Sequence, residues 1–153
     1  MEGIIGTDVV TQIAIIVEDI DKAKQAYAEF FGVPVPETQE PGPFEVTQTQ
    51  YKGEPAPKAK ARLAFFNVGE HLQLELIEPN GEASVWQDHL DQHGEGFHHI
   101  AFQVKGMDSM LERCEEAGLE TVQRGRYGNG GGEYAYLDAL KDLKIFVELL
   151  ENY

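Results

Sequence analysis

The sequence predicts an α+β protein in which two βαβββ modules form one curled, mixed sheet. The main observation is an internal repeat: Ile13-Ala14 and Asp21 recur 87 residues later as Ile100-Ala101 and Asp108. In both places a helix-like segment follows an apolar, strand-like run, and each half of the chain ends in another apolar strand that carries a carboxylate. Such a repeat is typical of two copies of one supersecondary unit that share a core.

The length and composition suit a single domain. A chain of 153 residues, with 42% hydrophobic and 25% charged residues, can bury a core of its own and resembles an ordinary soluble protein. We therefore expect one domain over 1–153, divided into modules at approximately 8–80 and 95–151.

The charge and the lone cysteine restrict the partners and the compartment. A net charge of −15 argues against nucleic acid or an anionic membrane as the partner, although a local basic cluster could still hold a small anion. No apolar run approaches the ~18 residues of a membrane span, and no signal peptide is evident. Cys114 cannot form an intramolecular disulfide and is expected to be a buried helix thiol, so we expect a cytoplasmic protein.

The first half of the chain begins with a strand and a helix. The strand covers 8–17, and a helix follows with Asp19 or Asp21 as its N-cap and Gly32 at its end. The further elements expected here are a proline-rich connection over 34–43, strands over 44–51, 59–68 and 72–78, and a helix over 84–93 capped by Ser84.

The second half repeats this plan. Its strand, over 94–104, leads to a helix that ends at Gly118. Strands are expected at 120–125, 133–138 and 144–151. The glycine-rich segment 128–132 lacks the lysine and following helix of a P-loop, so we expect a mobile loop near the mouth of a site.

The strand over 94–104 contains two adjacent histidines. Successive side chains of a regular strand point to opposite faces, so His99 shares a face with Ala101 and Gln103 while His98 lies on the other. A face with small and polar residues can accommodate a ligand. We therefore interpret His99 as a candidate site residue and His98 as a packing or gating residue.

Polar side chains interrupt three other apolar strands as well. Gln12 begins one, Glu75 lies with Gln73 on one face of another, and Glu148 lies in the middle of the last. At the offset of the repeat, Gln12 corresponds to His99. An isolated buried carboxylate costs several kcal/mol unless it is paired, protonated or bound to metal. Taken together, these residues indicate a shared metal site.

Each residue also has a simpler interpretation. His99 alone could be a hydrogen-bonded sheet histidine, and a lone carboxylate could face water from an edge strand. Other polar and aromatic residues are assigned to the surface or the core: solvated histidines (His71, His89, His93), rim cations that could contact CoA or a carboxylate (Arg124, Arg126, Lys141) and a packing anchor (Trp86).

The paired modules, with Gly96-Phe97-His98-His99-Ile100-Ala101-Phe102 and Val147-Glu148-Leu149-Leu150-Glu151, resemble the vicinal-oxygen-chelate (glyoxalase/bleomycin-resistance/dioxygenase) superfamily over nearly the whole chain. The resemblance implies a divalent metal in the cup of the curled sheet, held by Gln12, Glu75, His99 and Glu148. Methylmalonyl-CoA epimerases usually have His at the first position and often Gln at the second. The set Gln, Glu, His, Glu instead resembles that of some glyoxalase I enzymes.

The resemblance also implies an activity. We expect an isomerase or epimerase like methylmalonyl-CoA epimerase, or a lyase like lactoylglutathione lyase, that transfers a proton α to a carbonyl or thioester. Glu148 and Glu75 would be catalytic, with one Zn²⁺, Ni²⁺, Co²⁺ or Mn²⁺ ion as Lewis acid. The substrate would be an acyl-CoA thioester or a hemithioacetal, and the protein a homodimer.

Two other functions fit the same resemblance. The first is a metal-free, drug-sequestering binding protein, which has no use for two carboxylates in apolar strands. The second is an Fe²⁺ oxygenase, which favours two histidines and one carboxylate, so Gln12 argues against it and against fosfomycin-type transfer.

Overall fold

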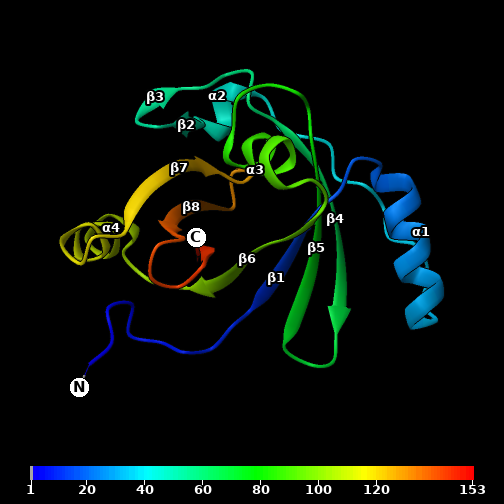
Figure 1. The fold of residues 1–153 in the computed structure, drawn as a ribbon, viewed down its shortest axis with the longest axis horizontal. Helices are drawn as coiled ribbons and strands as arrows, with labels where there is room; N and C mark the ends of the chain where they lie inside the picture. Colours follow the sequence, from blue (N-terminus) through cyan, green and yellow to red (C-terminus); the bar gives the residue numbers. More distant parts are fainter. Residues whose placement is uncertain (1) are drawn as a thin grey trace.

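The computed structural model describes residues 2–153, whose strands form one mixed sheet in the order β3-β2-β7-β8-β9-β6-β1-β5-β4. The sheet curls strongly without closing, because β3 and β4 remain at its two edges (Figure 1). In chain order the elements are β1 (Gln12–Ile16), α1 (Ile20–Phe31), α2 (Phe44–Thr47), β2 (Gln50–Tyr51), β3 (Glu54–Pro55), β4 (Ala61–Val68), β5 (Leu72–Pro79), α3 (Val85–His93), β6 (Gly96–Gln103), α4 (Met107–Glu116), β7 (Glu120–Arg126), β8 (Gly132–Ala139) and β9 (Ile145–Asn152). The predicted α+β class with a curled, mixed sheet is confirmed.

The two halves of the chain meet at the centre of the sheet. There β1 pairs antiparallel with β6, while each of them pairs in parallel with the last strand of its own half, β5 or β9. The order β9-β6-β1-β5 therefore brings together the four strands that carry the predicted polar residues. We retain the division into modules at 8–80 and 95–151 as an interpretation of this arrangement.

Helices α1 and α4 cover the outer face of the sheet near its two ends (Figure 1). Asp19 caps α1 by accepting a hydrogen bond from the Lys22 amide, and Gly32 ends it in the left-handed conformation at φ 70°, which glycine adopts without strain. Buried apolar residues of α1 pack on β4 and β5, whereas those of α4, among them Cys114, pack on β8 and β9. Both helices leave the inner face free for a site.

The inner face is partly covered by α3. Ser84 caps this helix, as predicted, by accepting a hydrogen bond from the Gln87 amide. Val85 and Trp86 pack against Ala14, Ile16 and other buried residues of the inner face. Trp86 is therefore a packing residue, as the sequence indicated.

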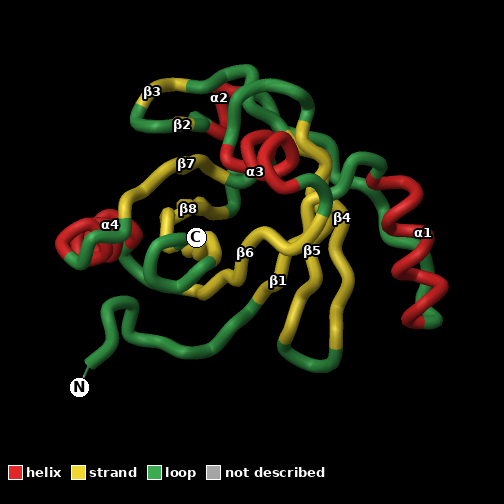
Figure 2. Tube along the Cα trace, in the orientation of Figure 1, coloured by secondary structure: helices red, strands yellow, loops and turns green. Residues whose placement is uncertain are grey.

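The strand expected over 44–51 is wrong. A short helix, α2, replaces most of it, and Gln48 then adopts a positive φ of 47°, which turns the chain into the β2–β3 hairpin (Figure 2). This hairpin extends the sheet beside β7, in the other half of the chain. The edge of β4 has only one bridge instead, between Gln39 and Leu63, because the proline-rich segment around Gln39 cannot supply a continuous row of amide donors.

The prediction that His98 and His99 lie on opposite faces is also wrong. The pairing of β1 with β6 passes from Ala14–His99 to Ile15–Phe97, so His98 is the extra residue of a β-bulge. Both imidazoles lie on the inner face. The His98 ring stacks on Phe146 at 5.2 Å between centroids, and it lies 5.1 Å from His99.

His89 departs from the prediction as well. It is partly buried, its ring lies 5.1 Å from that of His98, and its Nδ1 is enclosed without a hydrogen-bond partner among the described residues. His71 and His93 are exposed, as expected. None of the helices within residues 2–153 combines the length and apolar character that a membrane crossing requires.

Candidate functional site

The four predicted ligand residues come together on the inner face. His99 Nε2 lies 2.8 Å from Glu148 Oε2, 3.1 Å from Gln12 Oε1 and 3.7 Å from Glu75 Oε1. All four side chains are buried, and that of His99 is completely so. Glu75, His99 and Glu148 each offer one potential ligand atom, and these three atoms lie within 4.8 Å of one another. Since the residues come from four neighbouring strands, the sheet order creates the cluster.

Burial disfavours charge at this cluster. It raises the pKa of Glu148 to about 8, although a hydrogen bond from Tyr136 acts in the opposite direction. Burial, and then the proximity of Glu148, raises the pKa of Glu75 well above its usual value. Burial also lowers the pKa of His99 to about 3. Without a cation, burial therefore favours the neutral imidazole and the protonated form of the carboxyl groups.

The hydrogen bonding of the cluster is incomplete. A neutral imidazole nitrogen carries one proton or one lone pair, yet three side-chain oxygens surround His99 Nε2. Glu75 Oε1 and Glu148 Oε2 make no hydrogen bond within residues 2–153, although both are buried. Buried polar atoms are rarely left in this state, so the pair needs another partner.

A divalent cation fits these atoms. Two ligands that each lie ~2.0–2.2 Å from one ion are separated by roughly 2.8–4.4 Å, depending on the angle at the ion. The distances from His99 Nε2 to the three oxygens, 2.8, 3.1 and 3.7 Å, fall in this range. One imidazole, one amide oxygen and two carboxylates suit Mn²⁺, Co²⁺, Ni²⁺ or Zn²⁺.

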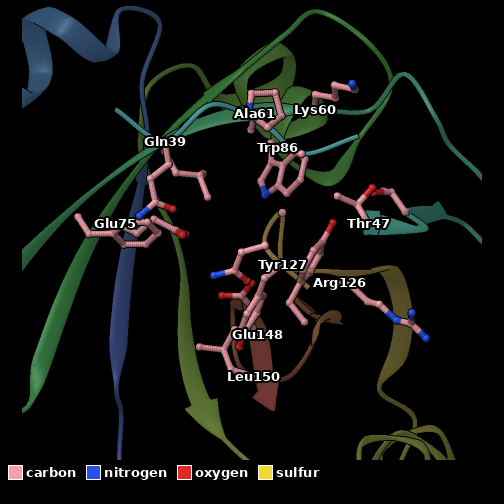
Figure 3. A pocket seen from close by; sticks show the side chains of 18 of the residues that line it. Gln39, Thr47, Lys60, Ala61, Glu75, Trp86, Arg126, Tyr127, Glu148 and Leu150 are labelled. Carbon is pink, nitrogen blue, oxygen red and sulfur yellow. The ribbon is translucent and has the colours of Figure 1, made fainter. Parts of the chain in front are cut away.

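A cavity of about 750 Å³ opens onto the cluster. Glu148 lies across the cavity from Trp86, and Glu75 lies at one side (Figure 3). Its wall is mixed: the apolar and aromatic residues include Leu63, Phe65, Trp86, Tyr134, Tyr136 and Leu150, and the neutral amides include Gln39, Gln73 and Gln103. A cavity of this size and composition can enclose the reactive end of an organic molecule.

Two irregular segments form the mouth of the cavity. The first runs from Gln39 to Ala61 and contributes lining residues before and after the β2–β3 hairpin. The second is the glycine-rich loop, which lines the cavity through Gly128 and Asn129. The two touch closely, since a Cβ placed on Gly42 would lie 2.6 Å from the Cα of Gly128. The predicted location of the glycine loop is thus confirmed.

The basic residues are divided between the cavity and the surface. Arg126 lines the cavity, whereas Arg124 is paired with Asp108 and Glu133 outside it, and Lys141 is not among the lining residues. Lys60 also lines the cavity but was missed from the sequence, where nothing distinguishes it from other surface lysines.

Tyr136 was also missed. It is buried, its hydroxyl accepts a 2.9 Å hydrogen bond from Trp86 Nε1, and its ring lies 5.1 Å from that of His99. The pairing of Tyr136 with Glu148 across β8 and β9 explains this position. The alternation of Tyr134 and Tyr136 along one strand could have indicated that both rings face inward.

Comparisons with the sequences of known proteins give two matches. A family model described as the glyoxalase/bleomycin resistance protein/dioxygenase superfamily matches residues 11–136. An uncharacterized protein of Bacillus subtilis, YqjC, is 31% identical over 99 residues, which cover 64% of this chain and 70% of YqjC.

Several solved structures share the fold. A hypothetical protein from Bacillus halodurans has a TM-score of 0.67 at 21% identity and covers 95% of this chain and 94% of its own. Methylmalonyl-CoA epimerase from Mycobacterium tuberculosis has a TM-score of 0.66 at 23% identity, with coverage of 94% and 87%. A variant of the Streptomyces coelicolor epimerase in complex with 2-nitronate-propionyl-CoA has a TM-score of 0.65 at 24% identity, with coverage of 94% and 96%. The chain therefore belongs to the glyoxalase/bleomycin resistance protein/dioxygenase superfamily.

Proposed function

We propose that this protein is a divalent-metal-dependent isomerase or epimerase that transfers a proton α to a carbonyl or thioester. The observation that carries the proposal is the convergence of two buried carboxylates and one amide on His99 Nε2, with one oxygen of each carboxylate making no hydrogen bond to the described residues. A site for neutral ligands alone would not require two carboxylates in so apolar a place.

Gln12, Glu75, His99 and Glu148 would hold the ion. When bound, it would act as a Lewis acid for the substrate oxygen on which negative charge develops. Gln12 is held in place for this role, because its Nε2 donates a 2.8 Å hydrogen bond to Gln73 Oε1 and its Oε1 thereby faces His99.

Glu75 and Glu148 are the proposed proton carriers. They come from β5 and β9, with β1 and β6 between them, so their carboxyl groups approach the site from two sides. One carboxylate takes the proton of the α-carbon, and the electrons of the broken C–H bond move onto the carbonyl oxygen. The other carboxylic acid returns a proton to the carbon, which inverts it when the two act on opposite faces.

A lyase of the lactoylglutathione type would need only one of these groups. In that reaction a single base removes a proton and returns it to the neighbouring carbon. The two reactions therefore differ in whether Glu75 is indispensable.

The proposed substrate is an acyl-CoA thioester or a hemithioacetal. The cavity accommodates an acyl group beside Trp86 and Tyr136, and Lys60 and Arg126 at its lining can attract an anionic carrier in a chain of otherwise high negative charge. Similarity in fold to epimerases bound to methylmalonyl-CoA and to 2-nitronate-propionyl-CoA supports the thioester. We also propose a homodimer, as the family resemblance implies.

The test is metal analysis followed by a substrate screen. We expect about one divalent ion per chain, a melting temperature that falls on chelation, and its recovery with added Mn²⁺, Co²⁺, Ni²⁺ or Zn²⁺. Turnover of methylmalonyl-CoA would identify the epimerase, and turnover of the methylglyoxal–glutathione adduct would identify the lyase. A protein that neither contains these ions nor is stabilised by them would instead be a metal-free binding protein.

A further inference from the structure

The β-bulge brings His98 into direct contact with His99. The two Nδ1 atoms lie 2.9 Å apart, and both rings are buried. In a regular strand, adjacent side chains point to opposite faces and could not make this contact. Gly96, whose φ is 143°, lies next to the bulge and adopts a conformation that other residues rarely take. The local backbone is thus arranged so that the two rings meet.

This hydrogen bond determines which nitrogen of His99 carries the proton. A hydrogen bond between two imidazole nitrogens requires one donor and one acceptor. If His99 donates from Nδ1, its Nε2 has a free lone pair that faces Gln12, Glu75 and Glu148. If His98 donates instead, His99 must carry its proton on Nε2, and that atom cannot bind a metal.

We propose that His98 is a positioning residue that accepts the Nδ1–H of His99 and so holds Nε2 of His99 ready to bind the metal ion. The inference depends on the metal site of the proposed function. It assigns to His98 a role in metal affinity beyond packing. Histidine ligands commonly donate their second ring N–H to an acceptor, and loss of that acceptor weakens metal binding.

The surroundings of His98 are compatible with this tautomer. As an acceptor at Nδ1, neutral His98 carries its proton on Nε2, which makes no hydrogen bond to the described residues. On that side the His89 ring packs nearly perpendicular to it, at 5.1 Å and 85°, and its own Nδ1 likewise makes no hydrogen bond within the described part of the chain. Within residues 2–153 no carboxylate forms an ion pair with His98, so no charged group on the α3 side imposes the other tautomer.

Phe146 and Tyr136 restrain the ring. The His98 imidazole stacks on Phe146 at an interplanar angle of 23° and meets Tyr136 edge-on. His98→Phe preserves this aromatic packing but removes the acceptor. His98→Asn removes the ring but can place a carbonyl oxygen close to the position of Nδ1. The two variants thus separate packing from hydrogen bonding.

The experiment measures dissociation constants of Zn²⁺ and Co²⁺ by competition with a chromophoric chelator, using parent, His98→Phe and His98→Asn, with exposed His71→Asn as the control. We expect His98→Phe to bind either ion ~10–100-fold more weakly and His98→Asn to stay within about threefold of the parent, as for loss and retention of an outer-shell acceptor. The Co²⁺ absorption spectrum should change in His98→Phe alone. Melting of the metal-free proteins verifies that each variant folds.

A measurement on the parent protein does not depend on any variant. Long-range ¹H–¹⁵N correlations of the Zn²⁺-loaded, ¹⁵N-histidine-labelled protein should show His99 protonated on Nδ1 and His98 on Nε2. The opposite tautomers would overturn the inference, as would parent-like affinity in His98→Phe or equal weakening in both variants. If the parent protein binds none of these ions, both the proposed function and this inference are refuted. If the parent binds them tightly and His98→Phe binds them equally tightly, only the inference about His98 is refuted.

Discussion

Replacing Glu148 with Gln tests the site through stability as well as through activity. The amide preserves the shape of the side chain but can neither ionise nor carry a proton from the substrate. In the metal-free protein, burial raises the pKa of Glu148 to about 8, against a usual value of 4.5. The folded state therefore retains a proton that the unfolded state releases.

The sign and size of the effect follow from this shift. Between pH 4.5 and about 8 the folded protein binds more protons at Glu148 than the unfolded chain, so the contribution of Glu148 to the free energy of unfolding falls as the pH rises. The slope approaches about 1.4 kcal/mol per pH unit for one such proton. The pKa of Glu75 is raised in the same direction and partly by Glu148, so Glu148→Gln removes one contribution and reduces the other.

The assay is urea unfolding of chelator-treated protein at intervals between pH 5 and 9. We expect the metal-free parent to lose stability between about pH 6.5 and 8 and Glu148→Gln to lose much less. Below pH 6.5 the lowered pKa of His99, about 3, opposes the carboxyl effect. Glu112→Gln, an exposed substitution on α4, should follow the parent. Saturating metal should flatten the parent's profile, because a bound cation favours the ionised carboxylates.

Turnover provides the second readout. Loss of a positioned proton carrier typically lowers the rate ~10²–10⁴-fold, and we expect kcat on the identified substrate to fall by at least this much in Glu148→Gln. A variant with the parent's pH profile would refute the assignment of the buried proton to Glu148. Unchanged turnover would show that Glu148 is not the proton carrier.

Three further substitutions test the framework of the site. Gly96→Ala should destabilise the protein by ~1–3 kcal/mol in urea unfolding through backbone strain alone, since its Cβ would meet no atom within 4 Å, whereas Gly3→Ala should have no effect. Trp86→Phe removes the hydrogen-bond donor to the Tyr136 hydroxyl and should cost about 1 kcal/mol by the same assay; full stability would contradict a role for this bond. Asp19→Ala removes the cap of α1 and should lower stability by ~1 kcal/mol while metal affinity stays unchanged, since α1 covers the outer face; weaker metal binding would contradict that separation.

The sequence by itself determined the local structure and the residue types of the site. Caps such as Asp19 and Ser84 act within one helical turn, and the repeat relating Gln12 to His99 is visible without coordinates. A carboxylate in an apolar strand is conspicuous for the same reason: its burial cost does not depend on the details of the fold. These signals were sufficient to identify the four residues that the structure brings together.

Only the tertiary structure decided where the alternation of side chains between the two faces of a strand is interrupted, and which edge of the sheet a segment joins. The bulge at His98 depends on pairing with β1. It places the His98 side chain on the face opposite to the one that regular strand alternation predicts. The hairpin after Gln48 could have extended either edge of the sheet. It joins β7, whereas the chain around Gln39 makes a single bridge to the edge of β4. Tyr136 lines the cavity through the pairing of β8 with β9, and Lys60 lines it directly before β4. Periodicity and capping are local properties of the chain, whereas register and edge choice depend on contacts between residues far apart in sequence.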